Sequence, residues 1–406
     1  MDERGSIGLR VIVAGGGIGG LAAALAVSRV GWDVRVLEKS AAFSGVGAGL
    51  QLGPNVVRVL HQWGLADALA AVSAVPGCLQ VNSAPSGEAI ARLNLGPEMT
   101  QRYGAPYLTL HRADLHGVLL AALRQTDSRL YLDRSIEEFS QAAGGVTVQP
   151  AARLALECDA LIGADGLWSR VRGQLLADGL PRRTGHLAYR ALLPQSGLPE
   201  ALRSRDVTVW LGPRMHVVHY PVRGGDWLNL VAFVHGQPDA AALGEPGWDH
   251  RATAADLHAG LGGACAALRN RIEAVDDWSL WVMYDRPRVT GSRQLASGRV
   301  ALLGDAAHPM RPYLAQGAGM AIEDAAALAR ALSRADPSGG DVAARLHDYA
   351  QQRWRRNARV QARALRNGLV FHADGILRWG RDAALKTFGG RLLDMPWLYA
   401  GPPNEG

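Results

Sequence analysis

The segment that most constrains the fold of this chain is RVIVAGGGIGGLAAALAVSRVGWDVRVLEKS, residues 10–40. An apolar strand, a glycine-rich turn, an Ala/Leu helix and a second strand follow one another in it. Gly15 permits a tight turn, Gly17 allows a pyrophosphate to approach the backbone, and Gly20 allows the helix to pack closely on the strand. Glu38, at the end of the second strand, is placed to accept hydrogen bonds from ribose hydroxyls. The segment predicts a dinucleotide-binding unit and leaves FAD and NAD(P) open.

A second motif, DALIGADGLWSRVR, spans residues 159–172. Its apolar start predicts a short buried strand, and Asp165 with the following glycine predicts a tight turn. Asp165, Ser169 and Arg172 are four and three residues apart, so we expect them to share one face of a helix. Taken alone, the motif also fits a simple capped helix start.

A third motif, GDAAHPMRPYLAQGAGMAIEDA, spans residues 304–325 and follows an apolar strand. Ligands bind at the carboxyl ends of parallel strands, where Asp305 can accept a hydrogen bond from a ribose or ribityl hydroxyl. Gly317, Ala318 and Gly319 precede a predicted helix, so their N–H groups can face an anionic group. The reduced ring of a flavin carries such a charge, and the motif therefore favours FAD.

In this order, the three motifs resemble the signatures of the FAD-dependent aromatic hydroxylases, the p-hydroxybenzoate-hydroxylase-like class of flavoprotein monooxygenases. Further segments resemble the branch that contains salicylate, hydroxybenzoate and 6-hydroxynicotinate hydroxylases. These segments are GVGAGLQLGPN (45–55), LHRADLHGVLL (110–120), FHADGILRWGRDAAL (371–385) and PWLYAG (396–401). The resemblance runs along most of the chain.

The resemblance implies bound FAD, with NAD(P)H and O2 as co-substrates and no separate Rossmann domain for NAD(P)H. A C4a-hydroperoxyflavin would hydroxylate a small hydroxylated aromatic acid, salicylate-like, with release of CO2 where the carboxylate stands beside the hydroxyl. The alternatives are a heteroaromatic substrate such as a hydroxypyridine or hydroxynicotinate, and a flavin oxidoreductase of the same fold that inserts no oxygen. A flavin-binding protein without catalysis is a further alternative, against which the intact second motif argues. Gln51 counts against hydroxynicotinate, and Pro312 against simple para-hydroxylation of a hydroxybenzoate.

The resemblance also assigns residues to the cofactor. They are Gly15, Gly17, Gly20, Glu38, Lys39, Gly49, Arg112, Asp165, Asp305, Gly317, Ala318 and Gly319. Arg112 would bind the pyrophosphate, although a surface arginine near a helix start is the other interpretation. Asp165 would touch both FAD and the passing NAD(P)H.

The segments 206–212, 215–222 and 227–234 alternate in the manner of an antiparallel sheet. Period two places His216 and Tyr220 on the same face of the middle strand. From the residues alone they are as well explained as a hydrogen-bonded core pair. The resemblance instead implies that they lie over the flavin, with His216 as base or proton relay and Tyr220 orienting the substrate.

Three other residues are candidates for the substrate pocket. Gln51 is expected on a loop beside the flavin, where it could also satisfy backbone groups. Arg190 could pair with a substrate carboxylate, or form a salt bridge between domains. Pro312 would shape the pocket near the flavin, whereas His308 is interpreted as structural.

The predicted fold is α/β, with a Rossmann-like FAD-binding domain, an inserted antiparallel-sheet substrate domain and a C-terminal helical region. The predicted domains are 1–72, 101–180 and 289–340 for FAD, 73–100 and 181–288 for substrate, and 341–406 for the helical region.

The composition of the 406 residues is that of an ordinary globular protein, with a net charge of +6. The first strand is expected near Leu9, which leaves no room for a signal peptide, and no apolar run approaches ~18 residues. Three scattered cysteines give no disulfide framework and no metal-site spacing. We therefore expect a cytoplasmic monomer or homodimer that binds neither nucleic acid nor membrane. The basic segment 353–366 is interpreted as a solvated helix face.

Overall fold

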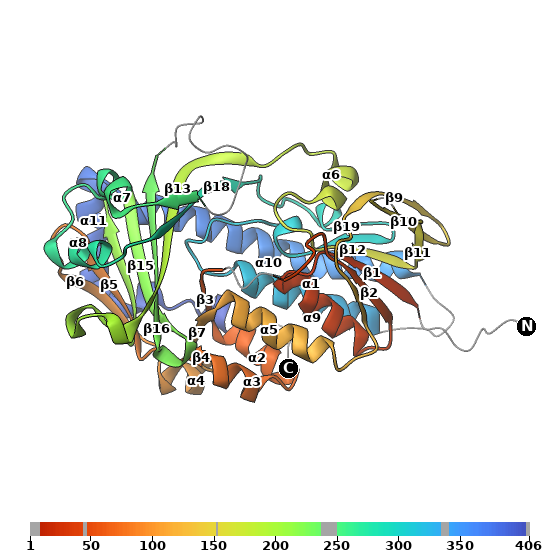
Figure 1. Cartoon of the computed structure of the whole chain (residues 1–406), viewed down its shortest axis with the longest axis horizontal. Coiled ribbons are helices and arrows are strands. Elements are labelled where there is room, and N and C mark those ends of the chain that lie inside the picture. Colours follow the sequence, from red (N-terminus) through yellow and green to blue (C-terminus); the bar gives the residue numbers. More distant parts are fainter. Residues whose placement is uncertain (1–8, 44–46, 152, 237–249, 334–340, 403–406) are drawn as a thin grey trace, which may run out of the picture.

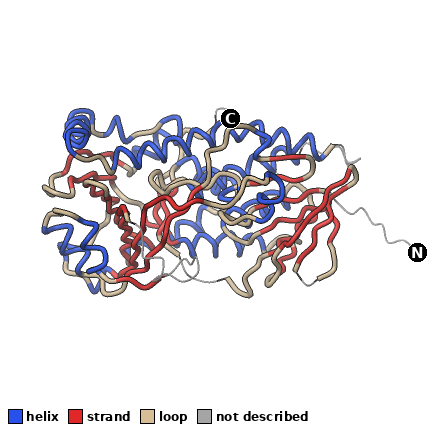
Figure 2. The backbone as a smooth tube through the Cα atoms, turned by 90° about the horizontal axis from the view of Figure 1, so that it is seen from above, coloured by secondary structure: helices blue, strands red, loops and turns tan. Residues whose placement is uncertain are grey.

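The computed structural model describes residues 9–43, 47–151, 153–236, 250–333 and 341–402. Strands gather toward the two ends of an elongated molecule, and helices run along one long side of it (Figures 1 and 2). None of the described helices is both long enough and apolar enough to cross a membrane.

The first sheet is the parallel sheet that the dinucleotide-binding unit predicts. Its strand order is β19–β20–β12–β1–β2–β8, parallel throughout except for β19. The strands are β1 (Arg10–Ala14), β2 (Asp33–Leu37), β8 (Arg129–Tyr131), β12 (Ala160–Gly163), β19 (Ala296–Ser297) and β20 (Val300–Leu302). Helices α1 (Ile18–Ser28), α5 (Arg112–Leu123) and α9 (Gly317–Ser333) pack together beside it. The three sequence motifs follow β1, β12 and β20, three neighbouring strands.

The second sheet has eight strands in the order β17–β18–β13–β16–β15–β14–β5–β6, and only β14 and β5 pair in parallel. The strands are β5 (Cys78–Ser83), β6 (Ala89–Asn94), β13 (Arg182–Pro194), β14 (Val207–Gly212), β15 (Met215–Val222), β16 (Trp227–His235), β17 (His250–Ala252) and β18 (Trp278–Asp285). The predicted strands over 206–212, 215–222 and 227–234 are thus confirmed.

Two three-stranded sheets and the remaining helices complete the described part. The small sheets contain β3 (Gly49–Leu52), β7 (Leu108–His111) and β4 (Ser73–Ala74), and β9 (Ile136–Ala142), β10 (Gly145–Pro150) and β11 (Leu156–Cys158). The helices are α2 (Pro54–Gln62), α3 (Ala66–Val72), α4 (Pro97–Tyr103), α6 (Arg170–Leu176), α7 (Ala254–Leu261), α8 (Ala266–Glu273), α10 (Val342–Phe371), α11 (Gly375–Phe388), α12 (Gly390–Leu393) and α13 (Pro396–Tyr399). The α/β fold class is confirmed. The domain boundaries stay a prediction, and 1–8, 44–46, 152, 237–249, 334–340 and 403–406 within them lie outside the described residues.

The two faces of the large sheet bury different side chains. Met215 and Val217 of β15 belong to a hydrophobic cluster that includes residues of α7 and α8. Tyr220 points to the opposite face and joins a cluster with Tyr107 and Met320. The period-two assignment of β15 is therefore confirmed, and the face that carries His216 and Tyr220 is turned toward the rest of the molecule.

The basic segment 353–366 is not a solvated face throughout, and that prediction was wrong. Arg353 is buried in α10, where its guanidinium pairs with Asp324 at 2.7 Å and with Glu323 at 3.0 Å. Arg356 pairs with Glu323 at 2.6 Å. Because α9 carries two adjacent buried carboxylates, the facing helix has to supply positive charge to the interior.

His219 makes the stability of the fold depend on pH. The side chain is buried on the α8 side of β15, and neither ring nitrogen has a hydrogen-bond partner among the described residues. Burial, with a smaller contribution from the charge of Arg271, lowers the pKa of His219 to about 3. The folded state thus binds a proton less readily than the unfolded state, whose histidine titrates near ~6.5. As the pH decreases from the unfolded value to the folded value, the free energy of unfolding should therefore fall by about 1.4 kcal/mol per pH unit.

We predict that His219→Leu raises the melting temperature, because leucine leaves no ring nitrogen without a partner. The gain over the wild type should widen as the pH falls from 8 to 5, as measured by thermal unfolding at each pH. His347→Gln, at an exposed position, serves as the control and should follow the wild type. A gain that is equal at both pH values would contradict the interpretation.

Candidate active site

The turn after β1 has the geometry that its glycines predict. Gly15 has a φ of +103°, and a Cβ on it would lie 2.5 Å from the carbonyl oxygen of Ala164. A Cβ on Gly20 would lie 1.8 Å from the oxygen of Gly15, so neither position accepts a side chain. Gly17 has no described atom within 4 Å of its Cβ position. Helix α1 begins there, without a side-chain cap and without an acidic residue in its first turn. The first N–H groups of the helix therefore face open space, and a pyrophosphate can bind to them.

Glu38 lies beside this turn, after β2. Its carboxylate accepts hydrogen bonds from the N–H groups of Gly16 at 2.6 Å and Ser40 at 2.8 Å. Burial raises the pKa of Glu38, but these N–H groups outweigh burial, and the net pKa lies below its ordinary value. Lys39 is exposed next to it and lowers the same pKa further. An ionised carboxylate oxygen has more than one lone pair, so Glu38 retains the capacity to bind a ribose hydroxyl.

The second motif is built differently from the expected shared helix face, and that prediction was wrong. Helix α6 begins only at Arg170, and Asp165 lies in the turn before it. One oxygen of Asp165 accepts from the N–H groups of Arg170 at 2.8 Å and Val171 at 3.2 Å, while Ser169 caps the helix through the N–H of Arg172. The alternative, a capped helix start, is the arrangement present. Contact of Asp165 with a cofactor stays a prediction.

Arg172 has a role that the spacing did not reveal. It is buried, and its guanidinium donates to the carbonyl oxygens of Ala306 at 3.1 Å and Ala307 at 2.6 Å. Asp178 compensates its charge at 2.6 Å. The second motif therefore holds the first residues of the third.

The third motif brings its predicted cofactor residues to one place. Helix α9 begins at Gly317 rather than after Gly319, so Gly317, Ala318 and Gly319 form its first turn. The Cβ position of Gly317 lies 4.0 Å from Oδ1 of Asp305. Asp305 is exposed to solvent. Desolvation by the surrounding protein nevertheless raises its pKa, and the charges of His308 and Arg112 lower it by a smaller amount. The carboxylate is accessible to solvent, and Arg112 is near enough to lower its pKa.

His308 is structural, as expected. Its Nε2 lies 2.5 Å from Oδ2 of the buried Asp324, and that oxygen also accepts from the N–H of Gly304 at 3.2 Å. The loop of the third motif is thus fixed from beneath by α9.

The candidate substrate residues lie on the inner face of the large sheet. His216 stacks on Phe233, with ring centroids 4.5 Å apart, and meets the edge of Tyr313 at 5.1 Å. Tyr313 follows Pro312, so the third motif reaches the sheet here. Pro312 itself is exposed, and its role in shaping the pocket stays a prediction.

Gln51 lies in strand β3, not on the expected loop, because it pairs with Thr109 of β7. Its Oε1 accepts from the hydroxyl of Tyr107 at 2.7 Å. The neighbouring Gly49 donates its N–H to Asn229, and a Cβ on Gly49 would lie 2.6 Å from the ring of Tyr220. The structure therefore brings Gln51 and Gly49 to Tyr220. Residues 45–46 of the segment that contains Gly49 and Gln51 lie outside the described residues.

Arg190 lies on the same face, on β13, with its guanidinium 4.7 Å from the ring centre of Trp281. Burial raises the pKa of Tyr220, while a hydrogen bond from Gln51 and the charge of Arg190 lower it. Burial dominates, so the net pKa of Tyr220 lies above its ordinary value, and the charge of Arg190 acts on this end of the face.

His216 differs from the base with an ordinary pKa that the sequence suggests. Its Nδ1 lies 2.7 Å from Nε2 of His372, the residue that ends α10. Burial, and then the charges of His372 and His186, lower the pKa of His216 well below its ordinary value. His216 is therefore neutral at neutral pH, and its contact with a substrate stays a prediction.

Sequence reasoning missed Asn229, Tyr107, Tyr313 and His372. Asn229 has the same sequence signal that revealed His216. Each is a polar residue at an alternate position of an apolar strand. The other three come from other elements, and only the tertiary structure brings them to this face.

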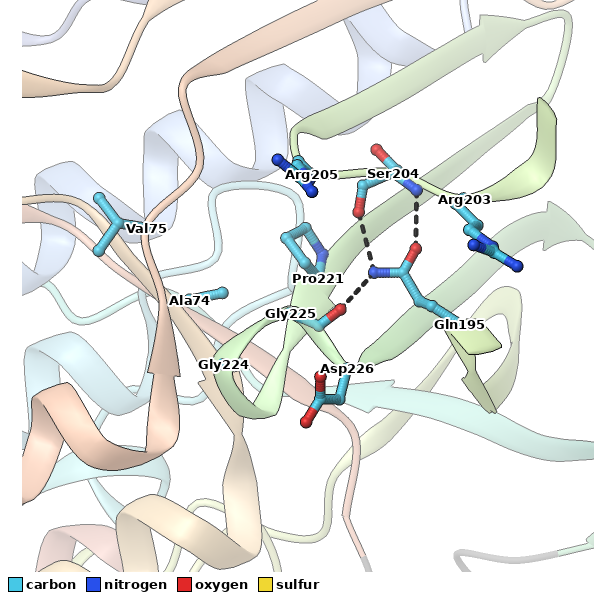
Figure 3. Close-up of a pocket in the computed structure, with 10 residues that line it drawn as sticks. All are labelled: Ala74, Val75, Gln195, Arg203, Ser204, Arg205, Pro221, Gly224, Gly225 and Asp226. Carbon is cyan, nitrogen blue, oxygen red and sulfur yellow. Dashed lines mark hydrogen bonds between the residues drawn. The ribbon is translucent and has the colours of Figure 1, made fainter. Parts of the chain in front are cut away.

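A hollow of about 510 Å³ lies elsewhere, beneath the turn before β16 (Figure 3). Its lining includes none of the predicted site residues. The side chain of Gln195 is used internally, because it binds the backbone of Ser204 at 2.7 and 3.0 Å and of Gly225 at 2.6 Å. The predicted substrate residues therefore lie away from this hollow.

Comparisons with known proteins show the family of the chain. A family model described as FAD binding domain matches residues 8–364. The chain is 36% identical over 395 residues to the 3-hydroxybenzoate 6-hydroxylase of Polaromonas naphthalenivorans (strain CJ2), with 96% of each chain covered. Its structure resembles Klebsiella pneumoniae HpxO complexed with FAD and uric acid, with a TM-score of 0.82, 26% identity and coverage of 95% and 94%. A salicylate hydroxylase substrate complex gives a TM-score of 0.80 at 26% identity, with coverage of 99% and 100%.

The glycine turn gives a paired prediction. Gly17→Leu should fold but lose FAD, because its φ of −73° is ordinary and its Cβ position is open. Gly20→Ala should instead lower the stability of the fold, since its Cβ collides with the backbone. Flavin absorbance per protein and the melting temperature measure the two effects.

Gly117→Leu is the matched control, at an exposed helix position that is also open around its Cβ. It should retain FAD. Stoichiometric FAD in purified Gly17→Leu would show that the pyrophosphate lies elsewhere.

Proposed function

Because this chain belongs to the FAD binding domain family and is an FAD-dependent aromatic hydroxylase, we propose that it hydroxylates a small aromatic acid that already carries a hydroxyl group. NAD(P)H and O2 are the co-substrates of this proposal. The observation that carries it is the inner face of the large sheet, where a neutral imidazole and a tyrosine that feels the charge of Arg190 stand four residues apart on β15.

The two ends of this face suit the two substituents of such a ring. At one end, Nε2 of His216 accepts a hydrogen bond from the ring hydroxyl, which increases the electron density of the ring. At the other end, Arg190 pairs with the carboxylate and Tyr220 orients it. The rings of Phe233 and Tyr313, which meet edge to face, keep water from the reacting carbon. Bound FAD supplies the activation of O2 and the oxygen transfer.

Two classes of substrate compete within this proposal. The names of the hydroxybenzoate relative and of the salicylate hydroxylase support a hydroxylated benzoic acid, and the salicylate-like choice includes release of CO2. The HpxO structure with uric acid supports a heteroaromatic ring instead. We favour the benzoic acid, because Arg190 brings a positive charge to the substrate face.

The test is a screen of hydroxybenzoates, salicylate, hydroxynicotinate and uric acid for stimulated oxidation of NADH and NADPH. Products are identified by mass under ¹⁸O2, which separates hydroxylation from decarboxylating hydroxylation. The proposal fails if reduced nicotinamide is consumed but no product contains ¹⁸O. That outcome would favour an oxidoreductase that inserts no oxygen.

His216→Ala tests the proposed acceptor. We expect the variant to retain FAD and substrate-stimulated NAD(P)H oxidation. Product formation should fall by about 10²–10⁴-fold, the usual contribution of a positioned base, with the lost product appearing as hydrogen peroxide. The ratio of product to NAD(P)H consumed measures this uncoupling, and an unchanged ratio would remove His216 from the mechanism.

Arg190→Met tests the carboxylate contact. We expect KM for the aromatic acid to rise by about 10–100-fold, the value of a charged hydrogen bond, with a smaller change in kcat. The neutral amide of the same substrate is the control. The KM for this amide should be the same in the variant and in the wild type. An equal rise for acid and amide would indicate a purely structural role.

A further inference from the structure

We propose that His186, His235 and His372 form a binding site for one divalent transition-metal ion, with Zn²⁺ as the best-suited ion. We call these three residues the tri-histidine site. One ring nitrogen from each lies within 4.8 Å of the other two. Their positions are far apart in the sequence, which is why no spacing revealed them.

Rigid elements supply all three ligands. His186 of β13 and His235 of β16 are directly opposite in the antiparallel register, and His372 ends the long helix α10. His186 and His372 are buried, whereas His235 is partly exposed and gives a route for an ion from solvent.

One of the three distances requires only a small adjustment, and the other pairs lie within 4.8 Å. Nδ1 of His372 lies 2.8 Å from Nε2 of His235. Zn²⁺ with bonds of about 2.0–2.1 Å in a tetrahedral site separates its nitrogen ligands by roughly 3.4 Å. The two rings therefore have to part by less than an ångström, and their shared hydrogen bond is replaced by two metal bonds.

Two of the three nitrogens that do not face the ion already have partners. Nδ1 of His186 lies 2.6 Å from the hydroxyl of Tyr313, which leaves Nε2 as its ligand atom. Nε2 of His372 lies 2.7 Å from Nδ1 of His216. Metal-binding histidines almost always have such a partner on the second nitrogen, because it fixes the tautomer and the ring orientation. Two of the three histidines here meet that requirement.

The charge around the tri-histidine site is compensated. The nearby Arg311 pairs with Asp285 at 2.8 Å, and Arg381 pairs with Asp382 at 2.8 Å. Arg214, the third neighbouring cation, is exposed. Among the described residues, the site contains imidazole ligands alone. Imidazole favours zinc, copper, nickel and cobalt over magnesium and calcium, and three ligands leave a fourth position open for water.

Occupancy of the site also reaches His216. A metal on Nδ1 of His372 confines its proton to Nε2, which then donates to Nδ1 of His216. The proton of a neutral His216 is in turn confined to its Nε2, so a bound metal would remove the acceptor that we propose for the substrate hydroxyl. The metal site does not rest on the proposed function, because it is tested without substrate or turnover.

The experiment uses the full chain with FAD bound and no histidine tag, after treatment with EDTA and removal of the chelator. Calorimetric titration with ZnCl2 should give one equivalent. Titration with Co²⁺ should give ligand-field absorption on the long-wavelength side of the flavin bands. His235→Ala, at the most exposed ligand, should weaken Zn²⁺ binding by at least about 100-fold, while Tyr313→Phe should weaken it by about 10-fold.

His347→Ala is the control for weak binding at an exposed histidine, and it should bind Zn²⁺ as the wild type does. Retained FAD and melting temperature establish that each variant is folded, and His186→Ala replaces His235→Ala if the latter fails. The proposal is overturned if the wild type binds no stoichiometric metal, which would leave a hydrogen-bonded chain of imidazoles. It is equally overturned if folded His235→Ala and His186→Ala bind Zn²⁺ unchanged.

Discussion

The cofactor side of the molecule depends on the buried charge cluster between α9 and α10. Glu323 and Asp324 are adjacent and fully buried, so their charges need Arg353 and Arg356 of the facing helix. Removing one partner of a buried pair typically costs about 3–5 kcal/mol. Asp324 also accepts from the N–H of Gly304. One carboxylate therefore fixes both α9, whose first turn is predicted to face the flavin, and the loop of the third motif.

The three motifs act as one unit because they follow neighbouring strands of a parallel sheet. Gly15 after β1 is in backbone contact with Ala164 after β12. Arg172, a few residues further on, binds the carbonyl oxygens of Ala306 and Ala307 after β20. A cofactor that lies across this edge contacts all three motifs at once, which explains why three short motifs so far apart in the sequence indicate one ligand.

The sequence predicted those features that depend on local pattern and missed those that depend on distant partners. Strand alternation placed His216 and Tyr220 correctly on one face, since side chains of a strand alternate whatever surrounds it. Helical spacing failed at Asp165, because it assumed a helix where the chain turns. It failed again at Arg353, whose partner Asp324 lies 29 residues away on another helix. His372 was missed for the same reason, since 156 residues separate it from His216.

Under the proposed function, one strand of the inner sheet face would orient the aromatic ring. His216 and Tyr220 are four residues apart, which is about 13 Å along a strand, a span that two side chains and one aromatic ring can fill. The charge of Arg190 marks the Tyr220 end and the neutral imidazole of His216 the other. A ring with a carboxylate and a hydroxyl has one favourable direction between them. The carbon facing the loop at Tyr313 then depends on where the substituents stand, so regiochemistry follows from the substrate as much as from the protein.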